Sequence, residues 1–573
     1  MDSFSVTNIK SFRDCACVDL KPITIIVGKN SCGKSSLIRF PVVLAQTITS
    51  GTSSPIKFYG SYIDYGNYEN VVFNGGQGPI SFSMKCLEKI HNKEHEVELV
   101  VSLLKYEKTI IIEKNEVYVD GTLSYGLYRT DDGKYSIKIY QIIGKGNLVM
   151  IPEEPIEVVI GSVKTYAFYI YPSAMEDIET EIIDNYFPEL DRYADRLVKN
   201  SYGIFGELVP DVFHKLKDVY IERKVKGKKD PDQLNFFQIS NAFHMYEDLL
   251  QRFRHNFSNE LSRVTYIGPF RQAPKRIYRD EEFETENVGG YGENIGSVLI
   301  SGLQNNKLLI DKISAWVERF MGYKLIVDEV NSGYYQILLE DRNGIKSNIM
   351  DVGYGISQML PVIIQVLAES YDAGINEFPT DKVRIKFPRY SGNSLNEAIR
   401  LFPSGDKPLM FPEDDKGDEN EEFTYDDEDE LDDIDEYYYY DDLDEDSDSD
   451  EPQVHKYGRT IVIEQPELHL HPAAQSELAE LFAEAVIDTE NKLLIETHSE
   501  HLIRKIQVLV SDPNCRLTNE DVAVFYVDKS EDGGAFVKEL KILPNGKFAE
   551  KWPSGFFDKA HELSMELLKN SMN

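Results

Sequence analysis

Several features that would place this 573-residue chain in a membrane, a secretory pathway or a zinc-binding class are missing from its sequence. It has no run of 18 apolar residues, and its start, MDSFSVTNIKSF, lacks the basic and apolar stretches of a signal peptide. Its five cysteines are odd in number and form no C-x-x-C pair, which argues against a disulfide framework or a zinc site. We expect a soluble, cytoplasmic protein of two or three domains that has reduced thiols and does not enter a membrane.

Positive charge is also scarce, since 61 Lys and Arg stand against 98 Asp and Glu, a formal net charge of −37. Residues 413–451 hold 24 acidic residues and one lysine, so they carry −23 and leave −14 for the rest of the chain. Such a block repels itself and is not expected to pack into a core. Two interpretations stay open: a solvated loop, or an acidic arm around Tyr437–Tyr440 that docks on a basic groove as an autoinhibitory plug or partner contact.

A glycine-rich loop near the N-terminus is the strongest motif. An apolar run, Ile23–Val27, is followed by Gly28-x-x-x-x-Gly33-Lys34-Ser35 and then by a stretch suited to a helix. The glycines let backbone N–H groups face phosphates, Lys34 can bridge the β and γ phosphates, and Ser35 offers a hydroxyl to Mg²⁺. The pattern predicts a phosphate-binding loop for ATP and Mg²⁺.

A second half of the same site is predicted more than 400 residues later. The apolar run 460–463 ends in Glu464, where such sites hold magnesium, and another apolar strand precedes His498. A histidine beside an apolar run is more often structural, but together with the other two motifs it is placed to reach a γ-phosphate or the attacking water. Gly353–Gln358, GYGISQ, is either a second anion cradle or a glycine turn in which Ser357 caps a helix.

These motifs resemble the ABC-type ATPase heads of the RecF/SMC/OLD group, in which two heads sandwich ATP. The resemblance implies an α/β fold: an ABC-ATPase head with a mixed sheet and flanking helices, assembled from N- and C-terminal parts, with an inserted antiparallel β region and a helical arm. It also implies a signature in trans from Gly355, Ser357 and Gln358, a D-loop at His471, and a switch histidine at His498. The predicted nucleotide-binding residues are Gly28, Asn30, Ser31, Cys32, Gly33, Lys34, Ser35 and Ser36; the predicted metal residues are Ser35 and Glu464.

A closer resemblance, to a bacterial subfamily, rests on YIGPFR, DVGYGISQMLP, IEQPELHLHP and WPSGFFD. Its members are often defence ATPases, such as the PtuA-like subunit of Septu and of retron-linked systems, which work with a small HNH nuclease. The resemblance implies such a nuclease partner and contact with nucleic acid through the complex. The WPSGFF segment is more simply explained as a packed C-terminal edge.

One departure from the ABC pattern concerns hydrolysis. The acid that holds Mg²⁺ is usually followed by a glutamate that polarises the attacking water, but Glu464 is followed by Gln465. A glutamine can orient a water but cannot accept its proton, although Glu467 lies nearby in sequence. We take Gln465, Glu467 and His498 as the candidate catalytic residues and predict tight ATP binding with slow hydrolysis.

The predicted organisation follows the motifs along the chain. The segments are 1–75, the N-terminal part of the ATPase head; 76–174, a β-rich insertion; 175–262, a helical arm; 263–370, head with signature; 371–458, an acidic insertion; and 459–573, the C-terminal part of the head.

The leading hypothesis is a regulatory ATPase that forms at least a head-to-head dimer and controls a separate nuclease in anti-phage defence. No Toprim-like D-x-D strand follows His498, so metal-dependent cutting would come from the partner. The alternative is a DNA repair or structural-maintenance ATPase that clamps duplex DNA through a basic run, which could equally be a solvated loop. That run contains Arg223, Lys224, Lys226, Lys228 and Lys229. A transporter ATPase fits less well, because the head is interrupted by insertions.

Overall fold

A computed structural model gives the fold for most of the N-terminal, central and C-terminal parts of the chain. The described residues are 1–50, 54–76, 78–90, 93–144, 147–150, 156–160, 165–166, 169–170, 256–280, 287–372, 458–487 and 489–552. Most of the predicted helical arm, the basic run with Arg223, Lys224, Lys226, Lys228 and Lys229, and the acidic insertion lie outside them. So does most of WPSGFF.

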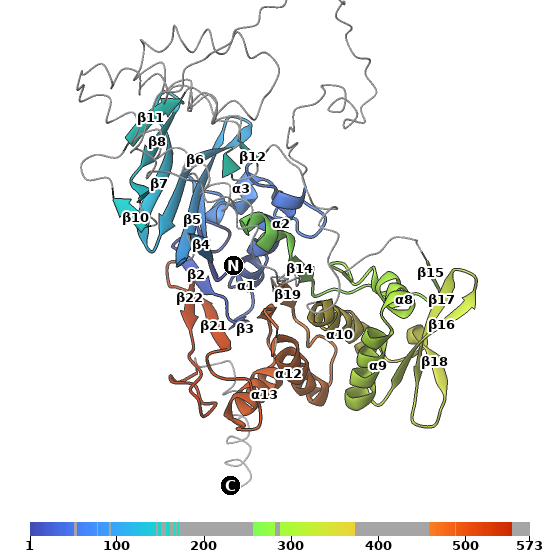
Figure 1. Cartoon of the computed structure of the whole chain (residues 1–573). Coiled ribbons are helices and arrows are strands. Elements are labelled where there is room, and N and C mark those ends of the chain that lie inside the picture. The colour runs from blue at the N-terminus through green and yellow to red at the C-terminus, as the bar shows by residue number, and fades with distance from the viewer. Residues whose placement is uncertain are drawn as a thin grey trace, which may run out of the picture. The chain divides into compact units, whose positions relative to one another are not determined.

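A six-stranded sheet joins the two ends of the chain (Figure 1). Its order is β14 (Val264–Ile267), β19 (Thr460–Glu464), β20 (Lys492–Glu496), β3 (Ile23–Gly28), β21 (Val522–Lys529) and β22 (Ala535–Glu539). The first five strands are parallel, and β22 pairs antiparallel with β21. The predicted α/β fold with a mixed sheet built from N- and C-terminal segments is confirmed.

Both faces of this sheet are covered, which explains why its strands are almost continuously apolar. Ile25 and Val27 face one core together with side chains from five helices, whereas Ile26 faces a second core that includes Phe40 and Phe82. The five helices are α8 (Ile295–Asn305), α9 (Lys307–Met321), α10 (Tyr354–Asp372), α12 (Pro472–Val486) and α13 (Glu500–Ser511). On the second face lie α1 (Lys34–Ile38) and α2 (Phe40–Thr49).

The second core is shared with an eight-stranded antiparallel sheet. Its order is β11 (Ile156–Ile160), β8 (Tyr135–Ile139), β7 (Thr122–Arg129), β6 (Thr109–Val119), β5 (Lys93–Tyr106), β4 (Ile80–Ile90), β1 (Ser3–Thr7) and β2 (Ala16–Asp19). The first two strands of the chain therefore belong to this sheet and not to the parallel one, because β1 pairs with both β2 and β4.

A small sheet lies beside α8 and α9. It contains β15 (Tyr278–Arg279), β17 (Tyr334–Glu340), β16 (Lys324–Asn331) and β18 (Lys346–Asn348). The remaining short elements are α3 (Tyr68–Val71), two 3-10 turns (Phe73–Gly75 and Ile349–Asp351), β9 (Gln141–Gly144), β10 (Asn147–Met150), β12 (Thr165–Tyr166) and β13 (Tyr169–Ile170). Within the described ranges, no helix combines the length and hydropathy that a membrane crossing requires.

Helix α9 gives a direct test of this packing, because neighbouring leucines face opposite environments. Leu309 is 7% exposed in the core and Leu308 is 61% exposed. We predict that Leu309→Ala lowers the free energy of unfolding by about 2–5 kcal/mol, whereas Leu308→Ala changes this free energy by about 0.5 kcal/mol or less. Chemical denaturation followed by tryptophan fluorescence checks this, since Trp316 is buried on the same helix. Equal effects of the two substitutions would contradict the helix orientation.

Candidate functional site

The phosphate-binding loop leaves β3 with a backbone that glycine alone accommodates at its first position. Gly28 has φ 149°, and a Cβ there would lie 2.0 Å from the carbonyl oxygen of Val527. Gly33 has φ 106° and Ser31 has φ 59°, so the loop turns sharply before α1 begins at Lys34. The sequence motif therefore folds as a tight turn between a buried strand and a helix, as a phosphate loop requires.

Two side chains of the loop are buried and hold its shape. Lys34 is 4% exposed, and its Nζ donates to the carbonyl oxygen of Lys29 at 2.7 Å. The Cys32 thiol lies 2.8 Å from the same oxygen and 3.1 Å from that of Val527, and burial raises its pKa. Cys32 thus packs through its side chain, which leaves its backbone N–H as the group through which it could serve a phosphate. The nucleotide role of these residues, and of Asn30 and Ser36, stays a prediction.

Glu464 ends β19, and both oxygens of its carboxylate accept hydrogen bonds. It is 1% exposed, and Arg39, the residue between α1 and α2, donates to it from Nε at 2.5 Å and from Nη2 at 2.7 Å. The hydroxyl of Tyr266, on β14, donates to the same carboxylate at 2.7 Å. Neither Arg39 nor Tyr266 was identified from the sequence. A bidentate guanidinium–carboxylate pair of this kind is strong and geometrically specific.

Glu496 is a third site residue that sequence reasoning missed. It ends β20 and is paired in register with Glu464 on the adjacent strand. Its Oε1 lies 4.0 Å from Lys34 Nζ, and the Ser35 side chain is close enough to lower the pKa of the carboxyl. Burial, and then the nearby charge of Glu464, raise its pKa to about 7. The signal was available, because parallel strands end at one edge of a sheet and Glu496 closes the strand before His498.

The turn that follows β19 is strained at two positions. Gln465 has φ 44° and His469 has φ 64°, in the left-handed region that non-glycine residues seldom occupy. The Gln465 N–H donates to the carbonyl oxygen of Glu496 at 2.8 Å, so the turn begins where the sheet pairing continues. His471 accepts a hydrogen bond from Ala473 N–H through Nδ1 at 3.4 Å and caps α12. Its D-loop role stays a prediction.

Glu467 connects this turn to His498. It is 9% exposed, and its Oε1 accepts the His498 backbone N–H at 2.6 Å. Its Oε2 is buried and has no hydrogen-bond partner among the described residues, and burial raises the pKa of the carboxyl. Burial, followed by the positive charge of Lys34, lowers the pKa of His498 to about 4. The imidazole is therefore neutral at pH 7.

The segment YIGPFR links the acidic strand to the predicted signature. Arg271 is 4% exposed and donates to the carbonyl oxygens of Glu464 at 2.8 Å and Gln465 at 3.3 Å. The carbonyl oxygen of Arg271 accepts from Gln358 Nε2 at 3.2 Å. Burial lowers the pKa of Arg271 to about 10, so it stays charged at neutral pH. Sequence reasoning quoted this segment only as a family mark and did not predict its role.

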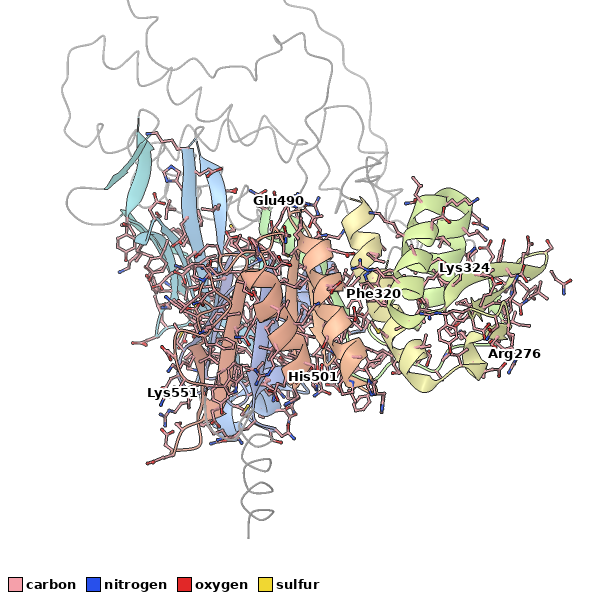
Figure 2. The ribbon with its side chains drawn as sticks, turned by 90° about the horizontal axis from the view of Figure 1, so that it is seen from below. Arg276, Phe320, Lys324, Glu490, His501 and Lys551 are labelled. Carbon is pink, nitrogen blue, oxygen red and sulfur yellow. The ribbon has the colours of Figure 1, made fainter. Side chains whose placement is uncertain are left out.

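A second arginine contact lies just after this segment. Arg276, labelled in Figure 2, pairs through both terminal nitrogens with Asp351, at 2.7 and 3.0 Å. Asp351 stands two residues before the predicted signature, Gly353–Gln358. Both charged groups are about half exposed, so this pair contributes mainly to position and little to stability.

The predicted signature residues lie at the start of α10 and are engaged within their own chain. Ser357 is 3% exposed and Gln358 is 2% exposed. A Cβ on Gly355 would lie 3.0 Å from the carbonyl oxygen of His469, so a glycine allows the helix to approach the turn after β19. The contact between Gln358 and Arg271 is thus a cis contact. A contribution of these residues to a second chain stays a prediction.

The residues present suit a magnesium ion bound together with phosphates. No three His, Cys, Asp or Glu side chains converge as a metal cluster in the part of the chain that the structure describes. Mg²⁺ does not need such a cluster, because it is usually held by one or two carboxylates and phosphate oxygens. Glu464, Glu496 and the Ser35 hydroxyl are oxygen donors of the suitable kind at this sheet edge.

Comparison with known proteins supports an ATPase domain in this region. Residues 434–503 match a family model described as "AAA ATPase domain", and this match includes Glu464, Gln465, Glu467 and His498. Residues 517–567 match a model described as "Protein of unknown function (DUF3696)". No curated protein matches the chain.

Among solved structures, the chain is similar to heads of SMC proteins. The SMC head domain from Thermotoga maritima has a TM-score of 0.32 and 7% identity over 94% of this chain and 99% of that chain. The Smc head domain with an extended coiled coil, bound to the C-terminal domain of ScpA and derived from Pyrococcus furiosus, has a TM-score of 0.31 and 10% identity over 100% and 99%. Likenesses this weak establish neither a shared activity nor a shared partner.

The state of His498 can be measured directly. We predict that its imidazole titrates near pH 4, because burial and Lys34 both disfavour the charged form. The unfolded chain then binds this proton more readily, so His498 lowers stability as the pH falls from about 6.5 towards 4. NMR titration of protein with labelled histidines checks the value, and His498→Gln identifies the resonance. A midpoint between pH 6 and 7 would show that partial burial and the charge of Lys34 do not lower the pKa of this imidazole.

Proposed function

We propose that this chain is an ABC-type regulatory ATPase of the RecF/SMC/OLD group that binds Mg·ATP, dimerises around it and hydrolyses it slowly. The observation that carries the proposal is the meeting of Lys34, Ser35, Glu464, Glu496 and His498 at one edge of the parallel sheet. These residues come from the two ends of the chain. The tight phosphate loop and the family match over 434–503 support the nucleotide part.

Slow hydrolysis is expected because the residue after Glu464 is Gln465, whose side chain is an amide. Hydrolysis joins a water oxygen to the γ-phosphorus, breaks its bond to the bridging oxygen and requires an acceptor for the water's proton. The amide of Gln465 cannot take that proton, whereas Glu467 has a free carboxylate oxygen and a raised pKa. We assign Glu467 as the proton acceptor. Its burial and its bond to the His498 backbone restrict its access to water, which keeps the rate low.

Dimerisation in the presence of ATP is the proposed way in which the protein signals that ATP is bound. In the proposed dimer, the start of α10, with Gly355 and Ser357, faces the nucleotide of the other chain. The bonds from Gln358 to Arg271 and from Arg271 to Glu464 and Gln465 join that helix to the acidic turn of its own site. Contact of α10 with the nucleotide of the other chain would therefore affect the nucleotide site of its own chain through these hydrogen bonds.

The proposed output is control of a separate nuclease, which in the related defence systems is a small HNH protein. This part rests on the sequence resemblance.

Co-purification tests the partner. The chain is expressed with the protein encoded beside it, and the complex is assayed for nuclease activity with and without ATP. A stable nuclease subunit whose activity changes with ATP supports the proposal. No co-purifying nuclease, together with duplex DNA binding that weakens steeply with salt, would favour the DNA-clamp alternative.

The hydrolysis mechanism makes a prediction about two neighbouring residues. Gln465→Glu should raise the rate of phosphate release by roughly 10²-fold, because it restores a proton acceptor, and Glu467→Gln should lower the residual rate further. Phosphate release at saturating Mg·ATP is the measurement, with Lys34→Ala as a control that loses phosphate contacts. Turnover of the wild-type protein as fast as a helicase, or an unchanged rate in Gln465→Glu, would contradict the mechanism.

A further inference from the structure

Two carboxylates stand side by side at the edge where Mg²⁺ is expected. Glu464 and Glu496 are register partners at the ends of β19 and β20, so both project from the same edge of the sheet. The family pattern assigns the metal to the first acid. The contacts of the two side chains instead favour the second acid, Glu496, as the metal ligand.

Glu464 has little capacity left for a metal. Both of its oxygens accept charge-assisted hydrogen bonds from Arg39, and one of them also accepts the Tyr266 hydroxyl. Arg271 holds its backbone carbonyl from the other side. A metal at Glu464 would compete with a bidentate pair whose acid is 1% exposed, and weakening that pair costs free energy.

Glu496 has the opposite environment. It is 2% exposed, and its Oε2 has no hydrogen-bond partner among the described residues. Its Oε1 is 4.0 Å from Lys34 Nζ, and the Ser35 side chain is near enough to lower the pKa of the carboxyl. Lys34 is predicted to bind the phosphates, and Ser35 is predicted to bind Mg²⁺. A buried carboxylate with a free oxygen at this place is a ready ligand for a hard cation.

We propose that Glu496, together with Ser35, holds the Mg²⁺ of Mg·ATP, and that Glu464 instead anchors Arg39. The Arg39–Glu464 pair then ties the end of α1 to β19 and fixes the phosphate loop against the acidic strand. This inference rests on the proposed nucleotide function and changes which carboxylate serves the metal.

The experiment measures binding of a non-hydrolysable ATP analogue to the full chain by calorimetry, with Mg²⁺ and with EDTA. The variants are Glu496→Gln, Glu464→Gln and, as a surface control, Glu490→Gln, whose exposed side chain precedes β20 (Figure 2). We expect Glu496→Gln to lose at least roughly tenfold of the Mg²⁺ enhancement of affinity while it keeps binding in EDTA. Glu490→Gln should match wild type, and Glu464→Gln should keep the enhancement but unfold at a lower temperature.

Two outcomes would overturn the assignment: a full Mg²⁺ enhancement in Glu496→Gln, or its loss in Glu464→Gln alone. If Glu496→Gln does not fold, Glu496→Asp keeps the charge and withdraws the carboxylate by one methylene. It should also lose part of the enhancement, and an unchanged enhancement would count against the proposal. Failure of the proposed function looks different, because the wild-type chain would then bind no nucleotide with or without Mg²⁺.

Discussion

Strands β19, β20 and β3 are parallel and paired in register, and this pairing places every candidate catalytic group at one edge of a single sheet. The phosphate loop leaves β3, the two acids close β19 and β20, and His498 follows β20. The apolar residues of these strands bury both faces of the sheet, so the register cannot slip by one residue without exposing a core. The positions of the polar groups are therefore fixed by the same burial that stabilises the fold.

Charge balance is the second condition that the site has to meet. Glu464, Glu467 and Glu496 are all buried, and carboxylates are costly to bury without partners. Arg39 compensates Glu464, Lys34 lies near Glu496, and Glu467 receives a backbone N–H and keeps one oxygen free. The uncompensated oxygens of Glu467 and Glu496 are the groups from which the proposed chemistry is built, because a bound cation or a proton would satisfy them.

The YIGPFR segment gives the site its connection to α10. Tyr266 and Arg271 reach the acidic strand and its turn, and Gln358 binds the backbone of the same segment. A shift of α10 would therefore strain the turn at Gln465, where the backbone is already left-handed. In the proposed dimer this connection would carry information between two bound nucleotides.

The sequence by itself determined the glycine-rich loop after a strand, the acidic strand ending at Glu464 and the position of His498 after a strand, because each depends on local pattern, while the α/β class came from the family resemblance. Only the tertiary structure decided the partners: Arg39 with Glu464, Glu496 with Lys34 and Ser35, and Arg271 with the turn at Gln465. Arg39 and Glu464 stand 425 residues apart, and no local periodicity relates them. The pairing of adjacent strands determines which acidic side chain lies beside which basic side chain. That pairing forms only when the two ends of the chain come together in one sheet.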